Sequence, residues 1–158
     1  MISVIMGVYN NEKTVKDAVF SILNGYHSDL EFIIVDDGST DATYSILEDI
    51  AKIDKRVFLL KNKENKGLAY SLNKALEIAK GDYIARQDAD DFSLPTRLEK
   101  ELSFLINNPS LDFCGTSANL IDADGQKWGE RIFPEDISKD ILIKYCPFIH
   151  PTMLFSSK

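Results

Sequence analysis

Four apolar, strand-like runs, each followed by an amphipathic helical pattern, constrain the fold of this chain more than any other feature. The runs are 2–8, 32–35, 57–60 and 83–85, and apolar residues recur at helical spacing after each of them. A strand that is repeatedly followed by a helix reaches its next neighbour by a crossover, which gives parallel strands with helices on both faces. The pattern therefore predicts an α/β fold built on a mostly parallel sheet.

The pattern changes after residue 110. Two further strand-like runs, 113–121 and 127–133, flank Asp124-Gly125, a dipeptide that favours a tight hairpin turn. The sequence therefore predicts a small antiparallel hairpin element in this region.

The C-terminal run 153–158 is apolar and is predicted to be a strand. With no helix or polar tail after it, we expect an unpaired strand edge that favours self-association into a homo-oligomer. No repeat, low-complexity tract or linker interrupts the chain, so residues 1–158 are predicted to form a single domain that is truncated at its C-terminal end.

The charge balance narrows the classes of function. The chain has 25 acidic and 18 basic side chains and a formal net charge of -7, which argues against a nucleic-acid partner because such proteins need a basic face. A phosphorylated ligand stays compatible, since a bound cation can invert the local charge. Cys114 and Cys146 are expected to be reduced thiols of a cytoplasmic protein, and no run approaches the roughly 20 apolar residues of a membrane span.

Polar clusters follow all four predicted parallel strands. They are Tyr9-Asn10, Asp36-Asp37-Gly38-Ser39, Asn65-Lys66-Gly67 and Asp88-Ala89-Asp90-Asp91. Each has a simpler interpretation as a helix cap, an ordinary turn or a solvated loop. Ligands of open α/β sheets bind at the carboxyl ends of the strands, so the placement of all four clusters favours one shared site.

The carboxylates at 88, 90 and 91 are the sharpest chemical feature. Acids this close repel one another unless a positive charge lies between them, and Mg²⁺ or Mn²⁺ would accept their oxygens while keeping positions open for phosphates. Asp-x-Asp alone is a weak motif, and Asp122-Ala123-Asp124 repeats it. That second copy precedes Gly125 and lacks the closing Glu of a calcium loop, so we predict a hairpin turn there.

In combination and order, these motifs resemble the family 2 glycosyltransferases of the GT-A fold, in particular bacterial enzymes that make surface polysaccharides. The matching segments are 2–10, 35–41, 65–68, 81–91, 95–98 and 148–152, which together extend over nearly the whole chain. One departure is Gly7, where many members have proline, and it changes backbone stiffness more than chemistry.

The resemblance implies a site of two parts. The implied nucleotide-binding residues are Val8, Tyr9, Asn10, Asp36, Asp37, Lys66, Gly67, Asp88 and Ala89, and the implied metal ligands are Asp90, Asp91 and His150. Within these sets Asp37 resembles the acid that accepts a hydrogen bond from uracil, Asp88 the acid on the ribose and Asp90 the principal ligand of Mn²⁺ or Mg²⁺. Lys74 is an alternative to Lys66 for base or phosphate. His150 could contact the acceptor instead of the metal, and a structural role for it beside proline is equally open.

The implied reaction is transfer of a sugar from a nucleoside-diphosphate sugar, UDP-linked, to an acceptor hydroxyl with inversion. A metal on both phosphates would stabilise the charge of the leaving group. The acceptor is expected to be a saccharide or lipid-linked saccharide, reached at the inner face of the membrane. The general base is expected beyond Lys158, because Glu130, Glu135, Asp136 and Asp140 lie in hairpin or helix-start contexts. The chain by itself is then expected to bind donor but to transfer sugar poorly.

Three other functions compete with this reaction. A nucleotidyltransferase would need a glycine-rich loop after the first strand, where only Gly7 is present. A phospho-acceptor signalling domain would carry its acid pair after the first strand, whereas the pairs here follow the second and fourth. A non-catalytic nucleotide-sugar-binding module stays open, because the binding residues are present and the base is not visible.

Overall fold

The computed structural model describes residues 1–132 and 146–157. Its centre is a six-stranded sheet in the order β3-β2-β1-β4-β8-β5. The strands are β1 (Ile2–Val8), β2 (Leu30–Asp36), β3 (Val57–Lys61), β4 (Tyr83–Arg86), β5 (Phe113–Cys114) and β8 (Leu154–Ser156). Strands β1, β2, β3 and β4 run parallel to one another, and β1 pairs with β4 as well as with β2. The predicted parallel sheet is confirmed.

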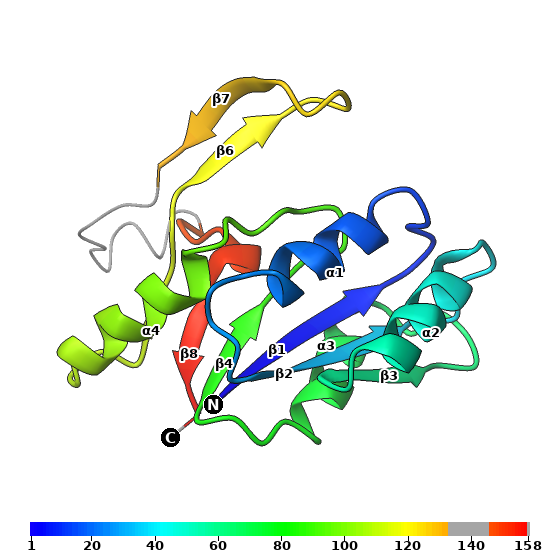
Figure 1. The fold of residues 1–158 in the computed structure, drawn as a ribbon, viewed down its shortest axis with the longest axis horizontal. Helices are drawn as coiled ribbons and strands as arrows, with labels where there is room; N and C mark the ends of the chain where they lie inside the picture. The colour runs from blue at the N-terminus through cyan, green and yellow to red at the C-terminus, as the bar shows by residue number, and fades with distance from the viewer. Residues whose placement is uncertain (133–145, 158) are drawn as a thin grey trace.

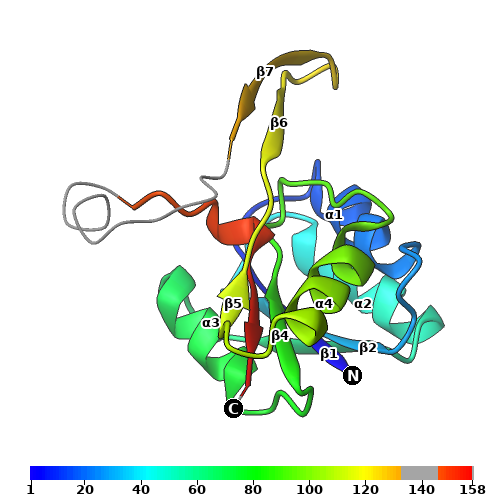
Figure 2. The same ribbon diagram turned by 90° about the vertical axis from the view of Figure 1, so that its left-hand side faces the viewer.

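Helices cover both faces of the sheet, because side chains on a strand alternate between the two faces. The helices are α1 (Val15–Leu23), α2 (Thr43–Ile53), α3 (Leu68–Leu76) and α4 (Arg97–Asn107). Val4 and Met6 of β1 pack into a core with α1, α2 and α4, whereas Ile5 packs with Ala75 of α3 on the other face. Figure 2 shows α3 on the opposite side of the sheet from α1 and α4. This two-sided packing is what the continuous apolar runs of the sequence require.

The hairpin consists of β6 (Ala118–Ile121) and β7 (Lys127–Arg131), and in Figures 1 and 2 it stands away from the sheet. Its turn is closed by Asp122, whose Oδ1 accepts hydrogen bonds from the amides of Asp124 at 3.0 Å and Gln126 at 2.8 Å. Gly125 has φ +78°, a conformation that glycine adopts without steric cost. The prediction of a hairpin turn at this second Asp-x-Asp is confirmed.

The prediction of one continuous strand over 113–121 is wrong. The segment forms β5 in the main sheet and β6 in the hairpin, with a break between them. At the break Thr116 donates its amide to Thr152 Oγ1 at 3.1 Å and its carbonyl accepts from the same hydroxyl at 3.0 Å. Thr152 belongs to η1 (His150–Thr152), so contacts with a segment distant in sequence turn the chain out of the sheet. The predicted end of the second hairpin strand, Phe133, lies outside the described residues.

The prediction of an unpaired C-terminal strand is also wrong. β8 is a strand, but it lies between β4 and β5 and pairs antiparallel with both. Leu154 is fully buried in the core. Both edges of β8 are therefore occupied, and the argument for self-association through this strand has no basis. In the described parts of the chain, no helix has the length and apolar composition needed to cross a bilayer.

Candidate functional site

The loops after β1, β2, β3 and β4 meet at the end of the sheet where these strands finish, which we call the carboxyl edge. β2 and β3 lie on one side of β1 and β4 lies on the other, so the strand order reverses between β1 and β4. Such a reversal is where α/β sheets bind ligands. The predicted placement of Asp37 and Asp90 at one edge of the sheet is confirmed, because they follow the strands on either side of β1.

Side chains join the loops after β1 and β2. The amide of Asn10 donates to Ser39 Oγ at 3.0 Å, and Asn10 Oδ1 accepts from the amide of Thr40 at 2.8 Å. Asn10 holds this position with φ +50°, a left-handed conformation that asparagine tolerates better than most residues. Thr14 extends the network to the loop after β4, since its hydroxyl donates to the carbonyl of Ala89 at 2.9 Å.

Asp37 joins the loops after β2 and β3 through its carboxylate. The amide of Lys66 donates to both oxygens, the amide of Gly67 donates to Oδ2 at 2.7 Å, and Asn62 Nδ2 donates to Oδ1 at 2.6 Å. Burial favours the neutral acid, but the hydrogen bonds from Asn62, Lys66 and Gly67 together outweigh it and lower the pKa of Asp37. The carboxylate that was predicted to meet the base therefore also fixes the loop beside it.

The other residues predicted to bind the nucleotide differ in solvent exposure and in their bonding partners. Tyr9 is exposed. Asp36 is fully buried and its Oδ2 accepts from the amide of Ser39 at 3.2 Å, which is a loop-holding contact. Lys66 forms an ion pair with Glu64. The alternative lysine, Lys74, donates to Asn62 Oδ1 at 2.8 Å. Val8 and Ala89 are buried, so their backbone is the part that faces the edge.

The residues at 88–91, which we call the acidic loop, follow β4. Arg86 forms an ion pair with Asp88 through a guanidinium nitrogen 3.0 Å from Oδ1. Asp90 and Asp91 are exposed, and their side chains make no hydrogen bond or ion pair with any residue that the structure describes. Partial desolvation and then the negative charges of Asp90 and Asp88 raise the pKa of Asp91. The positive charges of Arg97 and Arg86 oppose this rise only in part, so the loop presents two neighbouring carboxylates without a bonded partner among the described residues.

The acidic loop has the donor chemistry of a hard divalent cation. Neighbouring carboxylates without a bonded partner fit Mg²⁺ or Mn²⁺, which use one or two carboxylates and complete their shells with phosphate oxygens and water. Among residues 1–132 and 146–157, no group of three or more His, Cys, Asp or Glu side chains is arranged to hold a metal. Asp90 and Asp91 could supply two oxygen ligands of such a cation.

His150 lies beyond the carboxyl end of β4, the strand that leads into the acidic loop. The amide of Arg86 donates to the carbonyl of Met153 at 3.0 Å, which places η1 against this strand end. His150 is exposed and its Nε2 is 3.3 Å from the thiol of Cys146. The sheet thus brings His150 to the same edge as Asp90, while the imidazole contacts a thiol in this structure.

Three residues of the site were missed from the sequence: Asn62, Gln87 and Arg97. All three are buried and make several hydrogen bonds. Asn62 and Gln87 are the first residues after β3 and β4, the same position that Asp37 occupies after β2. That shared position is a sequence signal that would have identified them.

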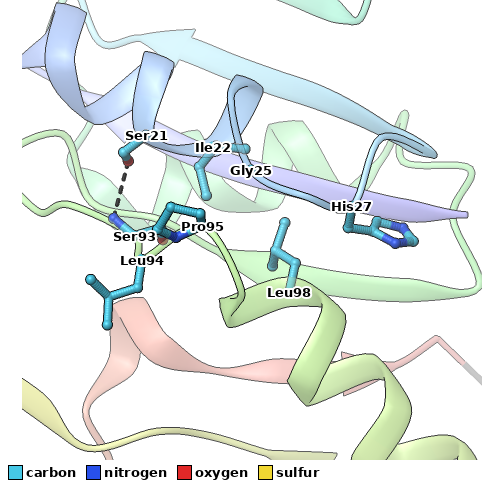
Figure 3. A pocket seen from close by; sticks show the side chains of 8 residues that line it. All are labelled: Ser21, Ile22, Gly25, His27, Ser93, Leu94, Pro95 and Leu98. Carbon is cyan, nitrogen blue, oxygen red and sulfur yellow. Dashed lines mark hydrogen bonds between the residues drawn. The ribbon is translucent and has the colours of Figure 1, made fainter.

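A small hollow behind the acidic loop is not a ligand site. It lies between α1 and the start of α4 and has a volume of about 10 Å³, close to the minimum for one water molecule. Figure 3 shows Ser21 and Ser93 facing each other across it, where the amide of Ser93 donates to Ser21 Oγ at 3.0 Å. The contact ties the chain just after the acidic loop to α1.

Similarity to known proteins agrees with this geometry. Residues 3–156 match the family described as Glycosyl transferase family 2. A Bacillus subtilis (strain 168) protein named glycosyltransferase EpsE is 44% identical over 154 residues, with 97% of this chain and 55% of that protein covered. The chain thus spans about half the length of curated relatives that it matches. Other relatives are named for teichuronic acid and O-antigen biosynthesis, as expected from the resemblance to surface-polysaccharide enzymes.

Solved structures share the fold. Residues 1–349 of S. aureus TarS in complex with UDP-GlcNAc superpose with a TM-score of 0.77 at 23% identity, over 98% of this chain and 45% of that one. The mannosyltransferase PcManGT from Pyrobaculum calidifontis in complex with GDP-Man and Mn²⁺ gives a TM-score of 0.67 at 28% identity, over 73% and 34%. Because the family match extends over nearly all of the chain, the protein belongs to glycosyl transferase family 2 and has its GT-A fold.

Proposed function

We propose that the protein transfers a sugar from a nucleoside-diphosphate sugar, UDP-linked, to the hydroxyl of a saccharide or lipid-linked saccharide, with inversion and with a divalent cation. One observation carries the proposal. The unpaired carboxylates of Asp90 and Asp91 lie at the strand-order reversal, beside the loops fixed by Asp37 and Asn10. In an acidic protein, a diphosphate needs a bridging cation at such a place.

Similar proteins support the choice of ligands. TarS was solved with UDP-GlcNAc, and PcManGT was solved with GDP-Man and Mn²⁺. We carry over the class of donor and the need for a cation, with Mn²⁺ or Mg²⁺ as the ion.

Each part of the carboxyl edge has a separate task in this proposal. The loops that follow β1, β2 and β3 hold the base, with Asp37 keeping the Lys66–Gly67 backbone in place. Asp88, which is paired with Arg86, contacts the ribose. Asp90, with Asp91 and His150 as further ligands, holds the cation. When bound, the cation stabilises the negative charge that develops on the leaving diphosphate.

The general base is not assigned to any described residue. Glu130 is paired with Lys127 in the exposed hairpin, and the pair lowers the pKa of Glu130, which suits a solvated surface acid. Glu135, Asp136 and Asp140 lie outside the described residues. Placement of the base beyond Lys158 stays a prediction, as does a cytoplasmic location at the inner face of the membrane.

A non-catalytic nucleotide-sugar-binding module is the second candidate. It is favoured by one observation: at the carboxyl edge, Asp88 is paired with Arg86 and Asp37 is held by loop amides, so neither carboxylate is available as a general base. The two candidates share the donor site and differ only in turnover.

A thermal-shift screen of nucleotide sugars, with Mn²⁺ and with EDTA, tests the donor class directly. We expect UDP-sugars to raise the melting temperature in Mn²⁺ and to do so much less in EDTA. Saccharide acceptors and a turnover assay then separate the two candidates, because a binding module gives the shift without product. No shift with any nucleotide sugar in either condition would contradict both.

A further inference from the structure

The side chain of Gln87 lies beneath the acidic loop and bonds to both of its ends. Gln87 is 1% exposed. Its Nε2 donates to the carbonyl of Asp88 at 3.1 Å and to the carbonyl of Asp91 at 2.8 Å. One amide group therefore spans the loop and fixes the distance between its first and last residues.

Hydrogen bonds from Arg97 fix the position of Gln87. Its Nη1 donates to Gln87 Oε1 at 3.0 Å and to Ser93 Oγ at 2.7 Å, while its Nη2 donates to the carbonyl of Arg86 at 2.9 Å. Its Nε donates to Glu101 Oε1 at 3.2 Å. The guanidinium thus joins the end of β4, the segment after the acidic loop and the first two turns of α4.

Holding a surface loop with this network costs free energy, because the network buries charged groups. Arg97 and Glu101 are 7% and 3% exposed, and burying a charged pair costs several kcal/mol in desolvation unless its geometry is very good. Glu101 Oε2 is buried and has no hydrogen-bond partner in the part of the chain that the structure describes. Apolar residues would stabilise the same packing at least as well, so the polar groups are better explained by what they orient.

What they orient is the acidic loop. The side chain of Asp90 has no partner of its own among the described residues, so its direction depends on the backbone on either side of it. That backbone is held at Asp88 and Asp91 by Gln87. Groups that orient metal ligands from behind typically change metal affinity 10–100-fold when they are removed.

We propose that Gln87 and Arg97 are positioning residues, which set the acidic loop so that Asp90 meets the cation bound to the donor diphosphate. Neither residue touches the cation. The inference rests on the proposed function, because it assumes that the cation binds between Asp90 and a diphosphate.

The test is calorimetry of UDP binding, in Mn²⁺ and in EDTA, to the wild type and to Gln87→Met. Methionine has a similar length and the same charge, but it cannot donate to the carbonyls of Asp88 and Asp91. We expect the gain in UDP affinity that Mn²⁺ provides to fall about tenfold or more, with little change in the affinity measured in EDTA. An unchanged gain would overturn the proposal.

Ser3→Ala is the matched control for lost stability. Ser3 is fully buried at the opposite end of β1, where its hydroxyl donates to Glu31 Oε1 at 2.6 Å and accepts from the amide of Gly81 at 2.8 Å. The variant loses buried hydrogen bonds without touching the carboxyl edge, and its Mn²⁺ gain should equal that of the wild type. A loss as large as that of Gln87→Met would mean that general destabilisation is the cause, and would overturn the proposal.

Arg97→Lys provides a second variant if Gln87→Met does not fold. Lysine keeps the charge beside Glu101 but cannot reach Gln87, Ser93 and the Arg86 carbonyl together, so the Mn²⁺ gain should again fall, and a wild-type gain overturns the proposal. Failure of the proposed function has a different outcome: wild-type protein that binds UDP equally in Mn²⁺ and EDTA contradicts the cation site itself. A Mn²⁺ gain in the wild type that persists in the variants contradicts only the positioning role.

Discussion

The carboxylate of Asp37 accepts a 2.7 Å hydrogen bond from the backbone amide of Gly67, 30 residues further along the chain. Gly67 immediately precedes α3 and has φ +89°. The contact therefore fixes both the end of β2 and the start of α3, the helix on the face of the sheet opposite α1 and α4. A residue expected from the sequence to meet a ligand is therefore also part of the frame that holds the ligand loops together.

Replacing Asp37 should weaken both the fold and nucleotide binding. Asp37→Ala leaves the amide of Lys66 without its acceptor and removes one of the two acceptors of the Gly67 amide and of Asn62 Nδ2. We therefore expect a loss of about 1–3 kcal/mol in the free energy of unfolding, measured by urea denaturation. Asp17→Ala, an exposed acid on α1, should stay within about 0.5 kcal/mol of the wild type. Wild-type stability of Asp37→Ala would show that the loop contacts contribute nothing.

Gly38→Ala should be more damaging than the same change at Gly125. Both glycines have positive φ, +77° and +78°, so alanine pays a similar backbone strain of about 1–2 kcal/mol at each. A Cβ at Gly38 would lie 2.8 Å from the carbonyl carbon of Glu64, whereas a Cβ at Gly125 would have no non-neighbouring atom of the described residues within 4 Å. The measurement is the melting temperature of each variant relative to the wild type, and the larger fall at Gly38 reports the close packing of the loops after β2 and β3. Equal falls in melting temperature for the two variants would show that these loops are not closely packed at Gly38.

Glu101 should make stability fall as the pH rises towards neutrality. Burial raises the pKa of Glu101 from 4.5 to about 7, against the opposing effect of Arg97. Between these values the unfolded chain loses the proton and the folded chain keeps it, so rising pH favours unfolding by up to about 1.4 kcal/mol per pH unit. The contribution is favourable below 4.5 and is lost once the pH passes about 7.

The measurement is the urea midpoint of the wild type and Glu101→Gln at several values from pH 5 to pH 8. Glutamine still accepts a hydrogen bond from Arg97 but does not titrate, so the wild type should lose stability relative to the variant over this range. Two profiles that stay parallel would show that Glu101 ionises in the folded protein as readily as in the unfolded chain.

The sequence predicted the features that depend on local patterns and missed those that depend on distant contacts. Apolar periodicity records which side chains are buried, which is why the parallel sheet was predicted. The Asp124-Gly125 turn is local as well. The split of 113–121 and the position of β8 depend on pairing with Thr152 and with β4, which no short window of sequence contains.

The same limit applies to the site. The position of a polar residue after a strand predicted the carboxyl edge, including Asp37 and Asp90. It could not predict that the Asp37 carboxylate would be occupied by loop amides, or that Arg97 on α4 would reach back to Gln87. These contacts join segments that only the folded sheet brings together, and they decide which carboxylates remain free for a ligand.

The central claim is that Asp90 holds a cation that bridges the donor diphosphate. The most direct measurement is calorimetry of UDP binding in Mn²⁺ and in EDTA, for the wild type, Asp90→Ala and Asp122→Ala. We predict that Mn²⁺ strengthens binding to the wild type, that Asp90→Ala removes this difference, and that Asp122→Ala, whose carboxylate closes the hairpin turn, retains it. Equal affinity of the wild type with and without the metal, or a Mn²⁺ effect that survives in Asp90→Ala, would contradict the claim.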